Sequence, residues 1–94
     1  MTQTTLLAAA QTAATSSDLV VAAGSTAAVG IFATGNVPPE VIIDLCIDSP
    51  GSDNLVAKLT AQNSVVVINA PGTYRAYRRD ISAYAVNVGV YSET

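Results

Sequence analysis

The stretch that decides the fold reads EVIIDLCID and spans residues 40–48. Its odd positions are all apolar, whereas its even positions include the acids Glu40, Asp44 and Asp48. Successive side chains of a β-strand point to opposite faces. The alternation therefore predicts a strand with one face in a core and the other partly in solvent, as is typical of antiparallel sheets.

Other runs of β-branched and apolar residues recur on both sides of this strand, separated by turn signals about every 8–12 residues. They span residues 19–23, 26–33, 54–59, 64–69, 73–78 and 84–91. Short strands at this spacing predict an all-β fold, an antiparallel β-sandwich of Ig-like or jelly-roll-like type with about seven or eight strands.

Four of these runs carry more detailed expectations. The runs 19–23 and 26–33 are separated by Gly24 and Ser25, which favours a hairpin. The run 64–69 is apolar on both faces, so we expect a central strand. In the run 54–59, the period of two places Leu55, Ala57 and Leu59 inward.

Residues 1–17, MTQTTLLAAAQTAATSS, contain no charged side chain. Their alanines would permit a helix, but the density of threonine favours an extended arm or a first strand. The segment also lacks the basic start of a signal peptide. We therefore divide the chain into this arm or first strand, 1–17, and a β-sandwich domain, 18–94, and expect Leu6 and Leu7 of the arm to contact another subunit.

The composition argues against several function classes. Charged residues make up 12% of the chain, about half of the ~25% usual for a soluble domain, which suits a protein that packs against others. The net charge of -3 argues against nucleic-acid binding, because neutralising a phosphate backbone needs many basic residues. No apolar run approaches the roughly 20 residues of a membrane helix, so no membrane partner is expected.

Few residues could carry catalysis or bind metal, and the chain has no histidine to act as a base or ligand. Cys46 is therefore expected to be a small buried hydrophobe. Asp48 and Asp53 flank a Pro-Gly turn, for which a self-bonded β-turn is the main expectation and calcium binding stays open. Glu40, Asp44 and Asp48 lie on one strand face, which does not make the facing carboxylates of a glycosidase. We expect no enzyme, no cofactor and no metal site.

Three of the four basic residues lie within five positions of the stretch TYRAYRRD, residues 73–80. We predict that this stretch contacts a protein partner, because Arg pairs with carboxylates and both Arg and Tyr are enriched at interface hot spots. The counterparts would be the acids of residues 40–48 or an acidic partner surface. In the alternative, the stretch is a solvated edge strand in which Arg78 or Arg79 pairs with Asp80. The predicted contact residues are Tyr74, Arg75, Tyr77, Arg78 and Arg79.

The order of phrases along the chain resembles small structural proteins of bacteriophage virions, of the head decoration or cement type. The matching phrases are ATSSDLVVAAGSTAAVGIFA (14–33), DSPGSDNLVAKLTAQNSVVVI (48–68), APGTYRAYRR (70–79) and SAYAVNVGVY (82–91). The resemblance implies a β-rich protein that is made in the host cytoplasm, lies on the outer capsid surface and binds the major capsid protein. It also implies a homo-oligomer, most commonly a trimer.

Two function classes remain open at this point. A cement protein would bridge capsomers and resist the pressure of packaged DNA, for which it needs a rigid fold and no active site. A receptor- or glycan-binding module of a fibre, or another head or tail accessory protein, would need exposed aromatic residues, and Tyr77 and Tyr91 are the candidates.

Overall fold

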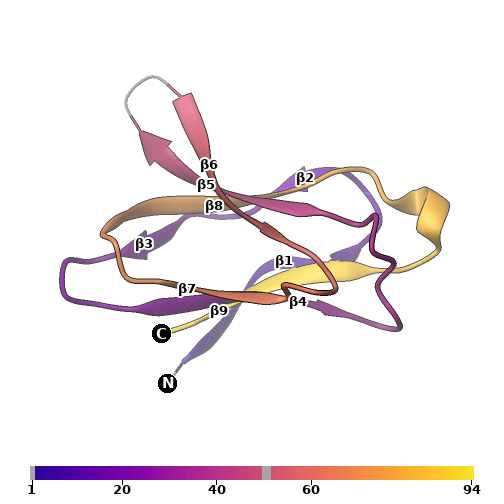
Figure 1. Ribbon diagram of the computed structural model, residues 1–94, viewed down its shortest axis with the longest axis horizontal. Coiled ribbons are helices and arrows are strands. Elements are labelled where there is room, and N and C mark those ends of the chain that lie inside the picture. Colours follow the sequence, from indigo (N-terminus) through magenta and orange to yellow (C-terminus); the bar gives the residue numbers. More distant parts are fainter. Residues whose placement is uncertain (1, 50–51) are drawn as a thin grey trace.

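The chain folds into two antiparallel β-sheets that pack face to face, drawn one above the other in Figure 1. The computed structural model describes the backbone of residues 2–49 and 52–94 and the side chains of residues 2–48 and 54–94. Its elements are β1 (Gln3–Ala10), β2 (Ala14–Thr15), β3 (Leu19–Val21), β4 (Ala27–Ala33), β5 (Ile43–Ser49), β6 (Ser52–Leu59), β7 (Val65–Ile68), β8 (Gly72–Arg78), the short 3-10 helix η1 (Ser82–Tyr84) and β9 (Val88–Glu93). The predicted antiparallel β-sandwich is confirmed.

Each sheet combines strands from distant parts of the chain. The first, which we call sheet A, has the order β1-β9-β4-β7. The second, sheet B, has the order β2-β8-β5-β6, with β3 also paired to β8. The edge strands are therefore β1 and β7 in sheet A, and β2, β3 and β6 in sheet B.

The core lies between the sheets and consists of the side chains that the strands turn inward. Sheet A contributes Val29, Val88 and Val90, and sheet B contributes Ile43 and Leu45, all fully buried. Burying an apolar side chain of this size stabilises a fold by about 1.5–3 kcal/mol. The alternation in residues 40–48 thus predicted correctly which side chains of that strand fill the core.

The N-terminal segment forms the first strand of sheet A. β1 pairs with β9, and beyond that pairing Thr2 and Thr94 exchange backbone hydrogen bonds. Leu6 and Leu7 are both buried, because a register shift between Thr5 and Leu7 turns two successive side chains inward. The expectation that these leucines contact another subunit does not fit their place in the core of their own chain.

The hairpin expected between residues 19–23 and 26–33 is wrong. β3 pairs with β8 in sheet B, whereas β4 lies in sheet A between β9 and β7. The connection turns through Gly24, whose φ of 81° suits a residue without a side chain. Val21 before it and Ala27 after it both face the core, so the chain crosses from one sheet to the other here.

Two further expectations about individual strands are also wrong. β7 lies at the edge of sheet A and not at its centre, and its Val65 and Val67 are 45% and 66% exposed. Leu55 of β6 is exposed and not inward-facing. The ladder between β5 and β6 shifts register between Leu45 and Cys46, and this bulge turns Leu55 to the outer face.

Two predicted strands begin three or four residues later than their sequence patterns. β5 starts at Ile43, since the N–H of Val41 donates to the carbonyl of Pro38 in the preceding turn. The run 84–91 begins in η1, where the N–H of Tyr84 donates to the carbonyl of Ile81 and leaves the Tyr84 side chain exposed. Local turns therefore replace the first residues of both expected strands.

Candidate interaction surfaces

The side chains of β8 alternate between the core and the outer face of sheet B. Those that point inward are Tyr74, Ala76 and Arg78. The Tyr74 hydroxyl donates to the carbonyl of Ala70 at 2.7 Å, a contact of the kind made by the tyrosine corner of Ig-like sandwiches. Tyr74 therefore holds the turn before β8 against the core and offers no surface to a partner, contrary to the predicted interface role.

Arg78 is buried between the two sheets and joins three segments of backbone. Its Nε donates to the carbonyl of Thr12 at 2.6 Å, and its Nη1 donates to the carbonyls of Ala8 at 2.9 Å and Val88 at 2.7 Å. Burial lowers the pKa of Arg78, because desolvation disfavours the charged form, although arginine stays protonated in proteins. Arg78 thus links sheet B to sheet A, which does not fit its predicted contact with another protein.

Arg75 and Arg79 form ion pairs on the outer face of sheet B, which we call the charged face. Arg75 Nε lies 2.6 Å from Asp18 Oδ1, and its Nη2 lies 3.5 Å from Asp48 Oδ2. Arg79 Nη2 lies 3.2 Å from Asp44 Oδ2. The acids of β5 are thus counterparts of the arginines, as predicted, but within the same chain.

Asp18 is a partner that the sequence did not reveal, because it lies 57 positions before Arg75. The two meet only because β3, which follows Asp18, pairs with β8. No local spacing signals a contact of this kind. Such exposed pairs contribute only about 0–1 kcal/mol each, so their main effect is to neutralise the arginines locally.

Asp80 caps the turn after β8 and does not pair with Arg78 or Arg79 in the described contacts. Its Oδ1 accepts a hydrogen bond from the N–H of Ser82 at 2.9 Å. Hydrogen bonds from Ser82 favour the ionised carboxylate and lower the pKa of Asp80 below its usual range.

Tyr77 and Cys46 occupy the charged face between the ion pairs. Tyr77 is half-buried opposite Asp44, and Cys46 is buried opposite Arg75. Asp44 Oδ1 is also buried and makes no hydrogen bond among the described residues. Of the predicted interface residues, only Arg75, Tyr77 and Arg79 therefore reach the surface.

The Asp48–Asp53 turn is only partly described. Asp48 is exposed and within reach of Arg75. The side chain of Asp53 and residues 50–51 lie outside the described residues. Calcium binding at this turn therefore stays as open as the sequence left it.

The outer face of sheet A carries two aromatic rings that lie against glycines, and we call it the aromatic face. Phe32 of β4 lies opposite Gly89 of β9, and Tyr91 of β9 lies opposite Gly30 of β4. The ring centroids are 6.4 Å apart, and the ring planes are inclined by 48°. A Cβ atom at either glycine would meet the facing ring, so the missing side chains let both rings lie close to the sheet.

A shallow hollow of about 330 Å³ opens beside the rings, lined by Gln3, Thr5, Phe32 and Tyr91. It combines amide and hydroxyl groups with aromatic surface, and this combination suits a neutral polar partner. The sequence pattern indicated Tyr91 as a candidate but gave no sign of Phe32. The sequence does contain a signal, since β4 and β9 each carry a glycine and an aromatic residue two positions apart. This signal indicates a contact only when the two strands are known to pair.

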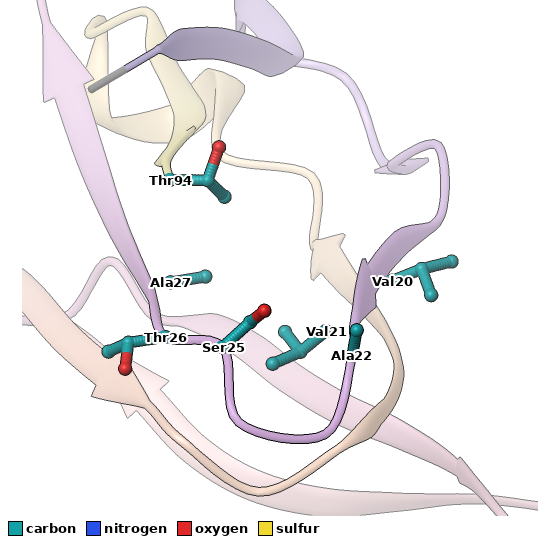
Figure 2. Close-up of a pocket in the computed structure, with 7 residues that line it drawn as sticks. All are labelled: Val20, Val21, Ala22, Ser25, Thr26, Ala27 and Thr94. Carbon is teal, nitrogen blue, oxygen red and sulfur yellow. The ribbon is translucent and has the colours of Figure 1, made fainter.

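A second hollow, of about 210 Å³, lies where the chain crosses from β3 to β4 (Figure 2). In Figure 2 the crossing loop curves along one side of it and Thr94 lies on the other. Its lining residues are Val20, Val21, Ala22, Ser25, Thr26, Ala27 and Thr94. The side chains of these residues supply alkyl and hydroxyl groups to the hollow.

Among the side chains that the structure describes, those of residues 2–48 and 54–94, no three Cys, Asp or Glu gather as metal ligands would. Within that same part of the chain, no helix has the length and apolar character needed to cross a membrane.

No protein-family model matches the chain, and no curated protein matches it at a significant level.

Proposed function

We propose that this protein is a non-enzymatic structural protein of a bacteriophage virion, a decoration or cement protein on the outer surface of the head. The order of phrases in the sequence supports this role, and the aromatic face is the observation that carries it. Strands β4, β7 and β9 together contain one charged residue, Glu93. Interface centres are rich in aromatic residues and poor in charge, as this face is.

The aromatic face is a better contact surface for the capsid protein than the arginines of the charged face. Arg75 and Arg79 are already engaged by Asp18, Asp44 and Asp48. An acidic partner would have to compete with these carboxylates, and the gain from rim charges is small. At Phe32 and Tyr91 a partner does not compete with carboxylates, because it displaces only water from the exposed parts of the rings.

The scaffold behind this face suits a protein that bridges capsomers. Arg78 ties β8 of sheet B to β1 and β9 of sheet A, which resists sliding of one sheet over the other. A surface held in this way loses little conformational entropy on binding. Copies that are linked to one another and each make a weak contact with the shell then attach more strongly than a single copy does.

Sedimentation with empty heads of the phage tests this function. The wild-type chain is expected to sediment with the heads. Phe32→Ala should weaken binding by at least about tenfold, as loss of a hot-spot aromatic does. Tyr84→Ala is the matched control, because Tyr84 and Phe32 are 41% and 38% exposed but lie on different surfaces. Wild-type protein that stays in the supernatant would refute the decoration role. If Phe32→Ala binds the heads as well as the wild type does, the aromatic face is not the contact surface.

A second candidate is a receptor- or glycan-binding module of a fibre or of another head or tail accessory protein. The hollow lined by Gln3, Thr5, Phe32 and Tyr91 favours it, because the C–H face of a sugar packs on an aromatic ring while its hydroxyls bond amide and hydroxyl groups. A glycan-array signal that Gln3→Ala abolishes, together with no binding to heads, would select this candidate over the first.

A further inference from the structure

Strand β7 is an edge without the features that protect the other edges of the sandwich. Exposed edges invite pairing with another chain, and proteins blunt them with bulges, charges or very short strands. β1 has two register shifts, and β6 has one together with Lys58. β2 and β3 have only two and three residues. β7 pairs with β4 in unbroken register and consists of three valines and an isoleucine.

The backbone of β7 also presents hydrogen-bonding groups at its free side. Residues of an antiparallel strand alternate between those that bond the neighbouring strand and those that point away from it. The N–H of Ile31 donates to the carbonyl of Ser64, and the register of β4 and β7 continues from that pair. Val66 and Ile68 therefore direct their backbone groups toward β4, whereas Val65 and Val67 direct theirs outward.

The surroundings of β7 suit a copy of the same strand. A two-fold axis brings each residue close to its own counterpart, so any charge beside the axis would meet a like charge. The sequence holds no charged residue between Lys58 and Arg75. The side chains of Val65 and Val67 are exposed on the outer face of sheet A, where they could pack against valines of a second copy.

We propose that β7 pairs antiparallel with β7 of a second copy of this chain, across a two-fold axis that passes beside Val66. Val65 of one copy then lies opposite Val67 of the other, and each such pair exchanges its outward-pointing N–H and carbonyl groups. This pairing joins the two four-stranded sheets into one continuous sheet. The added strand also covers apolar side chains that are otherwise in water.

One of the two neighbouring registers is disfavoured because it needs groups that are already in use. A shift that placed Val65 opposite its own counterpart would bring Val67 opposite Asn63. The N–H and carbonyl of Asn63 are both bonded to Thr60 in the turn before β7. The register that pairs Val65 with Val67 avoids this turn and uses every outward group of the two valines.

The interface is small, so we expect a reversible dimer with a dissociation constant in the micromolar range, on the order of 10–100 μM. The proposed dimer has two-fold symmetry and therefore differs from the trimer that the resemblance implies. It does not depend on the virion role, because it can be measured with the purified chain alone. Failure of the pairing and failure of head binding are therefore separate results.

Analytical ultracentrifugation over a concentration series tests the pairing with two matched substitutions. Val67→Lys places a charge beside the axis, and Val20→Lys places the same charge on β3, where Val20 is 70% exposed against 66% for Val67. We expect the wild type and Val20→Lys to dimerise alike, and Val67→Lys to raise the dissociation constant at least about tenfold. Val67→Pro should act in the same way, because it removes an N–H that only the second copy uses.

Amide exchange of the wild-type chain gives a test that needs no variant. The N–H groups of Val65 and Val67 should exchange rapidly in dilute protein and become protected as concentration rises, in step with the dimer fraction. A chain that stays monomeric at millimolar concentration overturns the proposal. A trimer, or an oligomer that persists in Val67→Lys, would also overturn it. The same holds if Val20→Lys loses association as much as Val67→Lys does, or if the exchange rates of both amides do not change with concentration.

Discussion

Gly30 and Tyr91 form a cross-strand pair between β4 and β9, and the ring of Tyr91 covers the place that a side chain at position 30 would occupy. A Cβ atom on Gly30 would lie 2.6 Å from the Tyr91 hydroxyl oxygen. Two residues along the same strands the arrangement is reversed, because there the aromatic residue, Phe32, belongs to β4 and the glycine, Gly89, belongs to β9. The aromatic face thus depends on two glycines as much as on the two rings.

The two glycines should differ in their tolerance of alanine. In Gly30→Ala the atoms nearest to the new methyl group all belong to the end of the half-buried Tyr91 ring, which can swing outward. In Gly89→Ala the methyl group also meets the carbonyl of Leu7 at 2.7 Å, and backbone cannot move aside in this way. We expect Gly89→Ala to lower the free energy of unfolding by about 1–3 kcal/mol and Gly30→Ala by less. Urea unfolding measures both, and equal losses would contradict this view of the contacts.

Arg78 and Arg79 are sequence neighbours with opposite expected effects. Arg78→Ala leaves the carbonyls of Thr12, Ala8 and Val88 without their donor inside the sandwich. Each unsatisfied buried group costs about 1–3 kcal/mol, so a total loss of about 3–5 kcal/mol is expected. Arg79→Ala removes only an exposed ion pair with Asp44 and should cost less than about 1 kcal/mol. Chemical denaturation of both variants checks the contrast, and similar stabilities would count against the role of Arg78.

Ser16 completes the hydrogen bonding between the two short strands that pair with β8. Its Oγ accepts from the N–H of Ala76 at 2.9 Å, and its own N–H donates to the Ala76 carbonyl at 2.8 Å. Ser16→Ala would leave the buried N–H of Ala76 unbonded, and we expect a loss of about 1–3 kcal/mol. Ser17→Ala is the control, since the Ser17 side chain is exposed. Thermal unfolding of the pair should separate them by several degrees, and coincident transitions would show that the Ser16 hydroxyl is dispensable.

Asp80 should titrate below the usual pKa of an aspartate, because Ser82 donates hydrogen bonds to its carboxylate. A depressed folded-state pKa means that the carboxylate stabilises the fold at pH values above the unfolded pKa, near 3.9. This contribution is lost as the pH falls through the folded-state value. NMR titration of the side-chain carboxyl carbon measures that pKa directly. A value at or above the ordinary one would mean that the cap at η1 is absent in solution.

The sequence was informative where a pattern depends on the strand itself. Ile43 and Leu45 are buried because alternation along one strand fixes which side chains share a face, and this can be read without knowing the neighbours. A period of two likewise separates Tyr74, Ala76 and Arg78, which are buried, from Arg75 and Tyr77, which are half-buried. Which of these faces was the inner one could not be read, because both carry an arginine and a tyrosine.

Features that depend on pairing between distant strands were not readable. The sequence around Val65 and Val67 has the composition of a central strand, and only the strand order shows that it lies at an edge. Leu55 is turned outward by a bulge that involves β5, for which residues 54–59 carry no signal. The contact of Phe32 with Tyr91 also requires the pairing of β4 with β9. Long-range register therefore accounts for most of the difference between expectation and structure.

The most direct measurement of the proposed function is a cryo-electron microscopy map of phage heads that carry this protein. We predict density for the sandwich on the outside of the shell, with Phe32 and Tyr91 against the capsid protein and the ion pairs of Arg75 and Arg79 toward solvent. Density confined to the tail or a fibre, or a sandwich that meets the shell through its charged face, would contradict the account.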